Sequence, residues 1–267
     1  MRASMSLDRC LVWLVTMTAA MPVQSTVPKL SLLRVAQEPT TRCVTVDYTL
    51  DAPAIVTFDV LTNGVSIGAA NVTHAYGDVN RLVQGGVRAI SWQAAKSWPG
   101  HMFSDDTVSV EVTAWSPDSP PDYMVVDLVT DKGARTYYTA PEHLPDGGLG
   151  NDRYKTDYLV MRRIPAEGKT FRMGSPGDEP GRRPNETLHY VTLTNDFYMS
   201  VFELTQGQYK NVIGTLEACN NKYAYAATHP IDWIVYRRFR GEKKLWPRDG
   251  HAVDPKSDLG MFRSTLN

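Results

Sequence analysis

Residues 42–67 read RCVTVDYTLDAPAIVTFDVLTNGVSI, and this stretch decides the fold class. Apolar and polar side chains alternate along residues 43–50 and again along 54–60. The apolar members of the two runs are Val44, Val46, Tyr48, Leu50, Val56, Phe58 and Val60. A period of two residues predicts half-buried β-strands. Asn63-Gly64 follows the second run, and this dipeptide favours a two-residue hairpin because both turn positions need positive φ.

The pattern of strands continues on the C-terminal side of this stretch. Residues Arg88–Trp92 and Thr107–Trp115 predict two further strands, and no helical period occurs from Lys29 to Ser119. Short strands with turn signals about every ten residues predict an immunoglobulin-like or fibronectin-like β-sandwich over residues 28–130. Trp92, Trp98 and Trp115 fit either a platform for stacking sugar rings or the packing of the sandwich itself, and both interpretations stay open.

The N-terminus has the order of parts found in a secretory signal peptide. Arg2 and Arg9 precede an apolar core, CLVWLVTMTAA at Cys10–Ala20, which ends in small residues. The core is too short to span a bilayer, which takes about 20 residues. We therefore expect a signal peptide at residues 1–25, a secreted, periplasmic or cell-surface protein, and no transmembrane segment after cleavage. A buried N-terminal helix and an uncleaved anchor are the alternatives.

Composition and charge narrow the remaining classes. The chain has 267 residues, 42% of them apolar, which is typical of globular domains. The net charge of −1 argues against nucleic-acid binding through overall charge. Cleavage would remove Cys10 and leave Cys43 and Cys219, either as isolated thiols or as a disulfide. The loop-rich stretch around Pro145 and Gly147 predicts a linker at residues 131–155.

The C-terminal segment mixes strands with one helix. Residues Tyr158–Ile164, His189–Leu193 and Phe197–Phe202 alternate like strands. Thr205 is a good helix N-cap, and Gln208 three residues later completes a capping box. Gly214 is placed to end that helix.

An ordered series of short matches runs through the chain. The pieces are PPDYMVVDL at 120–128, FRMGS at 171–175, VTL at 191–193, FYMSVFELTQGQY at 197–209 and HPIDW at 229–233. This series resembles the formylglycine-generating enzyme family, also called sulfatase-modifying factors, including secreted bacterial members with an N-terminal β-domain. The family-motif residues, taken as structural, are Met173, Gly174, Ser175, Glu186, His189, Phe197, Tyr198, Glu203, Thr205, Gln206, Tyr209 and Pro230.

The resemblance implies a partial α+β, C-type-lectin-like domain over residues 156–267. Active family members oxidise a sulfatase cysteine to formylglycine with oxygen and copper held by two cysteines, and complete members also bind calcium. The family's copper-binding cysteines and calcium ligands have no counterpart here, and Cys219 stands alone. We therefore carry over no catalytic, cofactor-binding or metal-binding residue. We expect a truncated family member without oxidase activity, poorly packed after about Gly241.

A second class of function remains open beside this one. The sandwich and the partial lectin-like domain would suit a cell-surface module that binds a glycan or a protein. An enzyme with a site unrelated to the family is the third hypothesis. The sequence indicates neither the partner nor the oligomeric state.

Overall fold

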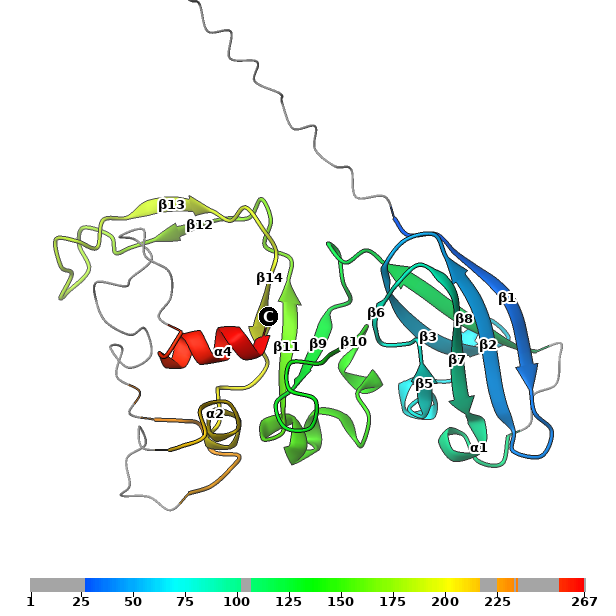
Figure 1. The fold of residues 1–267 in the computed structure, drawn as a ribbon. Coiled ribbons are helices and arrows are strands. Elements are labelled where there is room, and N and C mark those ends of the chain that lie inside the picture. Colours follow the sequence, from blue (N-terminus) through cyan, green and yellow to red (C-terminus); the bar gives the residue numbers. More distant parts are fainter. Residues whose placement is uncertain (1–26, 102–106, 217–224, 233, 235–254, 267) are drawn as a thin grey trace, which may run out of the picture.

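The structure is a computed structural model that describes residues 27–101, 107–216, 225–232, 234 and 255–266. The described chain is mostly β-sheet with few helices (Figure 1). The expected signal peptide, Cys219 and residues 241–254 lie outside the described residues.

The N-terminal unit is a two-layer sandwich of antiparallel strands. Its strands are β1 (Leu30–Gln37), β2 (Cys43–Leu50), β3 (Ala54–Thr62), β4 (Val65–Ser66), β5 (Ala75–Gly77), β6 (Arg81–Val83), β7 (Gly86–Gln93) and β8 (Val108–Trp115). One sheet has the order β1-β2-β7-β5; the other has the order β4-β3-β6, with β8 also paired to β3. The short helices are the 3-10 helix η1 (Ala69–Asn71) and α1 (Ala94–Ser97).

The core of the sandwich confirms the alternating pattern. All the apolar residues singled out on β2 and β3 are buried and belong to one cluster between the two sheets. Val108, Val110, Val112 and Ala114 of β8 pack against the same cluster. Asn63 and Gly64 have φ of 50° and 77°, and they join β3 to β4 in the predicted two-residue hairpin.

The C-terminal unit is built on a second antiparallel sheet with the order β10-β9-β11-β14. Its strands are β9 (Tyr123–Asp127), β10 (Arg135–Tyr138), β11 (Tyr158–Ile164) and β14 (Phe197–Ser200). The 3-10 helices η2 (Pro141–His143), η3 (Gly148–Gly150) and η4 (Asp152–Lys155) cover one face, and Leu144 and Tyr154 are buried there. The helices α2 (Gln206–Ile213) and α4 (Asp258–Leu266) cover the other face through Val212 and Leu266.

The boundary between the two units lies earlier in the chain than the sequence predicted. β9 was expected in the sandwich, but it pairs with β11 from Tyr158↔Asp127 to Arg162↔Tyr123. Residues 131–155 were expected to be a linker, yet they supply β10 and buried side chains of the sheet's core. The connection between the units is therefore the proline-rich stretch before β9. Arg163 and Tyr198 hold this stretch by donating hydrogen bonds to the carbonyl oxygens of Pro120, at 3.1 Å, and Pro121, at 2.6 Å.

A two-stranded hairpin and the last helix complete the fold. β12 (Thr170–Met173) and β13 (His189–Thr192) form a hairpin that extends away from the second sheet (Figure 1). The chain was expected to be poorly packed after Gly241, but α4 is packed against α2. Phe262 is buried against Tyr209, and the Tyr209 hydroxyl donates to Asp258 at 2.6 Å. The described residues contain no helix that is both long enough and apolar enough to cross a membrane.

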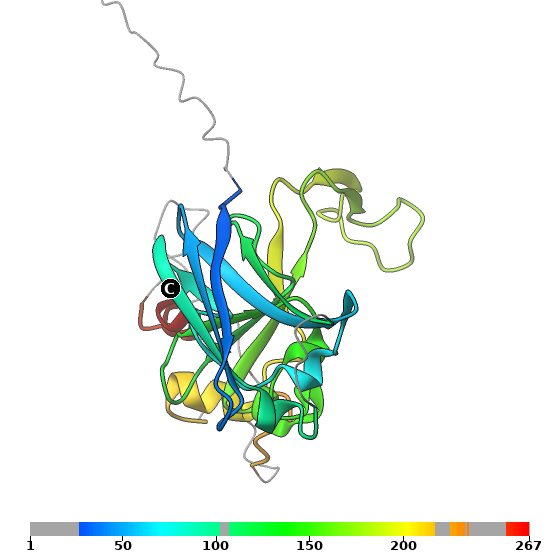
Figure 2. The same ribbon diagram turned by 90° about the vertical axis from the view of Figure 1, so that its right-hand side faces the viewer.

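The two units meet along β3, β6 and β10. The Tyr137 amide donates a hydrogen bond of 2.8 Å to the carbonyl oxygen of Asn80, which lies next to β6. Figure 2, turned by 90°, shows the sandwich in front of the second sheet. The segment that follows β10, from Tyr138 to Pro145, lies beside the face of β3 and β8 that points away from the sandwich core.

Candidate ligand site between the two units

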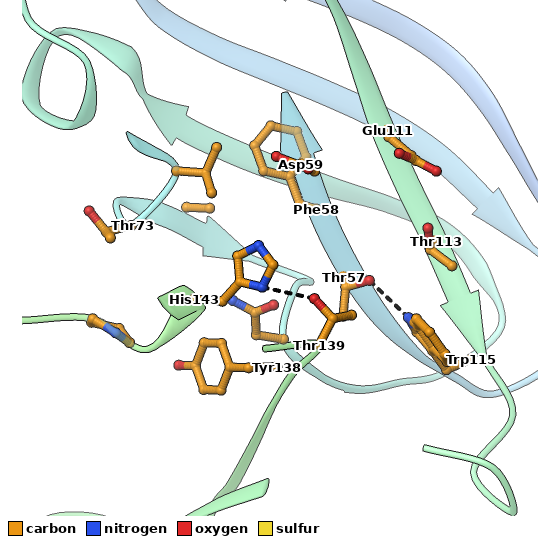
Figure 3. Close-up of a pocket in the computed structure, with 14 residues that line it drawn as sticks. Thr57, Phe58, Asp59, Thr73, Glu111, Thr113, Trp115, Tyr138, Thr139 and His143 are labelled. Carbon is orange, nitrogen blue, oxygen red and sulfur yellow. Dashed lines mark hydrogen bonds between the residues drawn. The ribbon is translucent and has the colours of Figure 1, made fainter. Parts of the chain in front are cut away.

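A cavity of about 230 Å³ lies at this junction (Figure 3). The outer face of β3 and β8 forms one wall, and the segment from Tyr138 to Pro145 forms the other. The side chains that line it are Thr57, Phe58, Asp59, Val72, Thr73, Ala75, Asn80, Glu111, Thr113, Trp115, Tyr138, Thr139, His143 and Pro145.

The strand wall follows from the alternation along β3. Because Val56, Phe58 and Val60 are buried in the sandwich core, Thr57 and Asp59 lie on the opposite face. The register places Thr113 beside Thr57 and Glu111 beside Asp59. Cross-strand partners lie about 4.5–5.5 Å apart at Cβ, so the Asp59 and Glu111 side chains start from neighbouring positions on this face. The indole nitrogen of Trp115 donates to Thr57 Oγ1 at 2.8 Å, which fixes the ring at the edge of the wall.

The loop wall carries a histidine held by one of its ring nitrogens. His143 Nδ1 and Thr139 Oγ1 lie 2.8 Å apart, and Figure 3 shows the ring directed from the loop toward β3. Leu144 is buried on the far side of the loop, and Tyr154 donates to the Pro145 carbonyl oxygen at 3.0 Å. Burial raises the pKa of Tyr138 above its ordinary value, so that this phenol stays neutral in the physiological range.

The lining favours a hydroxyl-rich ligand. Carboxylates accept strong, charge-assisted hydrogen bonds, and threonine hydroxyls both donate and accept. Trp115 adds an aromatic ring at the same site. Among the described residues, no lysine or arginine lines the cavity, and its acidic side chains are Asp59 and Glu111. Aromatic rings beside convergent polar groups suit the face and the hydroxyls of a sugar ring.

The structure separates the three tryptophans of the expected platform. Trp92 is fully buried in the sandwich core, where its ring lies 6.0 Å from that of Phe58. Trp98 stacks on His101, with ring centroids 3.8 Å apart. Trp115 lines the cavity. Sequence reasoning missed Asp59, Glu111 and His143, whose only signal was their place on the polar face of a strand or in a loop.

The family-motif residues of the hairpin make local backbone contacts. Gly174 has φ of 97°, and a Cβ there would clash with the carbonyl oxygen of Thr187. The Ser175 amide donates to the carbonyl oxygen of Glu186 at 3.0 Å, and His189 Nδ1 lies 2.7 Å from the Thr187 carbonyl oxygen. Met173 is exposed at the end of β12.

The remaining motif residues lie on β14 and around α2. Thr205 caps α2 in the predicted capping box with Gln208, and Gly214 ends the helix with φ of 88°. Thr205 also forms a β-bridge with Pro230, and Tyr209 is fully buried. Phe197 and Glu203 are exposed, whereas Tyr198 and Gln206 are half-buried. The motif residues are therefore divided among the hairpin, β14 and the α2 region, and none of them lines the junction cavity.

Cys219 lies outside the described residues, so the described part of the chain does not test a two-cysteine copper site. Copper(I) takes soft thiolate ligands, and the resembled enzymes use two cysteines. Cys43 is the cysteine within the described part of the chain; its sulfur lies 3.1 Å from Ser91 Oγ in the sandwich. That part also holds no group of three or more His, Cys, Asp or Glu side chains arranged for a metal ion.

Comparisons of the chain with protein-family models, with curated proteins and with solved structures gave no match.

Proposed function

We propose that this protein is an exported glycan-binding module that holds a sugar ring in the junction cavity. In this proposal the N-terminal unit is an immunoglobulin-like sandwich, and the C-terminal unit is part of a formylglycine-generating-enzyme-like, C-type-lectin-like domain that serves as a scaffold. The observation that carries it is the composition of the cavity. It combines the Asp59–Glu111 carboxylate pair, threonine hydroxyls and the Trp115 ring.

The arrangement of the cavity supports binding because its polar groups are fixed in advance. Trp115 is held through Thr57 and His143 through Thr139, so these side chains lose little rotational freedom when a ligand enters. The carboxylates would accept hydrogen bonds from adjacent sugar hydroxyls. The indole ring would pack against the apolar face of the sugar.

In this proposal the C-terminal unit, which resembles an oxidising enzyme, serves as a scaffold and has no oxidase activity. The motif residues of the hairpin and the α2 region make contacts that stabilise a backbone turn and a helix end. Incubation of the purified protein with copper, oxygen and a sulfatase-type cysteine peptide tests this point. We expect no formylglycine. If formylglycine formed, the protein would be an enzyme, and the binding proposal would be wrong.

Glycan binding is tested with an array of neutral and charged oligosaccharides, followed by calorimetry on those that bind. Asp59→Asn and Glu111→Gln keep the shape of the side chain but remove its charge. Because a hydrogen bond to a charged group contributes about 1.5–3 kcal/mol, each change should weaken binding by about tenfold or more. Asp118→Asn, at an exposed position outside the cavity, is the matched control and should leave affinity unchanged.

Two results would reject the proposal. The first is an array on which the folded protein retains no glycan. The second is binding that persists at full strength in both Asp59→Asn and Glu111→Gln, because the ligand would then lie elsewhere. Export is tested separately by sequencing the N-terminus of the mature protein; an intact N-terminus starting at Met1 would contradict cleavage.

A further inference from the structure

We infer that the binding site continues past the junction cavity into a second hollow, and that its ligand is a linear oligosaccharide without acidic groups. The inference rests on the proposed glycan binding and specifies the length and charge of the ligand. The second hollow has a volume of about 620 Å³ and lies between η1 and the η2–η3 segment. Its lining residues are Ala70, Thr73, His74, Pro141, Glu142, Leu144, Asp146, Gly147, Gly148 and Leu149.

The two hollows adjoin each other along one side chain and one short helix. Thr73 lines both of them. In η2, His143 lines the junction cavity, whereas its neighbour Glu142 lines the second hollow. A chain of linked sugar rings could thus pass over Thr73 from one hollow to the other, with η2 alongside.

The volumes favour a ligand longer than a single ring. Sites for small molecules commonly measure about 300–1,000 Å³. The junction cavity, at about 230 Å³, falls below that range, whereas the two hollows together fall within it. The second hollow is the larger of the two, which leaves room there for further sugar units.

The second hollow offers positioned polar groups of its own. His74 Nδ1 lies 3.1 Å from Thr73 Oγ1 and 3.2 Å from Ser97 Oγ, and Ser97 is buried. These contacts orient the His74 ring from the side of α1. The ring and the Glu142 carboxylate are thus available in the second hollow for hydroxyls of a second sugar unit.

Charge decides which oligosaccharides fit. Asp59 and Glu111 line the first hollow, Glu142 and Asp146 line the second, and no lysine or arginine of the described part of the chain lines either. The Arg153 guanidinium lies 3.7 Å from the Asp146 carboxylate, and both side chains are exposed to solvent. A sulfated or uronic-acid ligand would bring like charge beside these carboxylates, which is unfavourable at low ionic strength.

The test measures affinity against ligand length on the full chain. The probes are malto-, cello- and chito-oligosaccharides of one to six units, with sulfated cello-oligosaccharides as the anionic series. In the neutral series that binds, affinity should rise by about tenfold or more from one unit to three or four units and then level off. The sulfated series should bind more weakly, and this difference should shrink as salt is added.

A blocking variant locates the second hollow. Ala70→Trp fills that hollow from η1, so it should remove the gain with length while the affinity for a single unit stays unchanged. Ala95→Trp, exposed on α1 and outside both linings, is the matched control and should keep the gain.

The outcomes separate this inference from the proposed function. A single unit that binds in an Asp59-dependent manner, with no gain from further units or with preference for the sulfated series, would overturn the extended site and leave the glycan site standing. A gain with length that survives Ala70→Trp would also overturn it. Failure of every series to bind would reject the glycan function itself.

Discussion

Single side chains at the junction show which features of the site the alternation of apolar and polar residues predicts and which it does not. The alternation along residues 54–60 correctly placed Val56, Phe58 and Val60 in the core. The same rule assigned Asp59 to a polar face and could say no more, because period two does not tell what lies over that face. A segment about 80 residues further along, around His143, converts this face into a cavity wall.

The Thr57–Trp115 hydrogen bond is the first contact to test at this scale. In Thr57→Val the indole nitrogen loses its acceptor, which should cost about 0.5–1.5 kcal/mol of the free energy of unfolding. Thr45→Val, an exposed threonine on the outer face of β2, is the matched control and should change stability little. Urea unfolding measures both; equal effects in the two variants would mean that the bond contributes nothing.

The Asp196 carboxylate should make stability depend on pH. The Glu167 amide, at 3.0 Å, and the Arg163 guanidinium, at 2.7 Å, donate to this carboxylate and hold its pKa below the ordinary value of 3.8. A depressed pKa in the folded state adds stability above the unfolded value, and this contribution is lost as pH falls through the folded value.

The variant Asp196→Asn tests that dependence. It should lower the free energy of unfolding at pH 7, and its difference from the unmodified protein should shrink as pH is lowered below about 3.8. Chemical denaturation at several pH values measures this difference, with the exposed Asp118→Asn as control. A difference that stays constant from pH 7 to pH 2.5 would contradict the assigned role.

At the scale of elements, the sequence predicted which segments form strands better than it predicted their partners. β2, β3, β7, β8, β11 and β13 all lie where alternation placed them. β9 falls within residues 28–130, which were expected to form the sandwich, but alternation carries no information on pairing, and its partners β10 and β11 are both in the C-terminal unit. The capping box of α2 was predictable in full because it depends on residues only three apart.

The β12–β13 hairpin depends on one glycine. At Gly174, φ is 97° and an added Cβ would meet the Thr187 carbonyl oxygen, so Gly174→Ala should destabilise the hairpin by about 1–3 kcal/mol. Gly177→Ala is the matched control, since nothing lies within 4 Å of its added Cβ and its φ is not positive. Hydrogen exchange of the hairpin amides reports the local effect, and unchanged protection in Gly174→Ala would show that the turn tolerates a side chain.

At the scale of the molecule, the candidate site could not be predicted because it belongs to neither unit alone. Its walls come from the sandwich strands and from the stretch expected to be a linker. Glycine and proline in that stretch indicated turns correctly, since η2, η3 and η4 lie there, but a turn signal does not distinguish a free linker from a packed one. Burial of Leu144 and Tyr154, which fixes the loop wall, is a tertiary effect.

A buried hydrogen bond attaches α4 to α2 in the C-terminal unit. Tyr209 and Asp258 are buried and 49 residues apart, and the Tyr209 hydroxyl donates to the carboxylate at 2.6 Å. Tyr209→Phe keeps the ring contact with Phe262 but removes this donor from a buried acceptor, so it should lower the free energy of unfolding by about 1–3 kcal/mol. Tyr225→Phe, at an exposed tyrosine, is the matched control. Because this hydrogen bond attaches α4 to α2, Tyr209→Phe should also make residues 255–266 more sensitive to protease, and equal digestion of both variants would argue that α4 is held by other contacts.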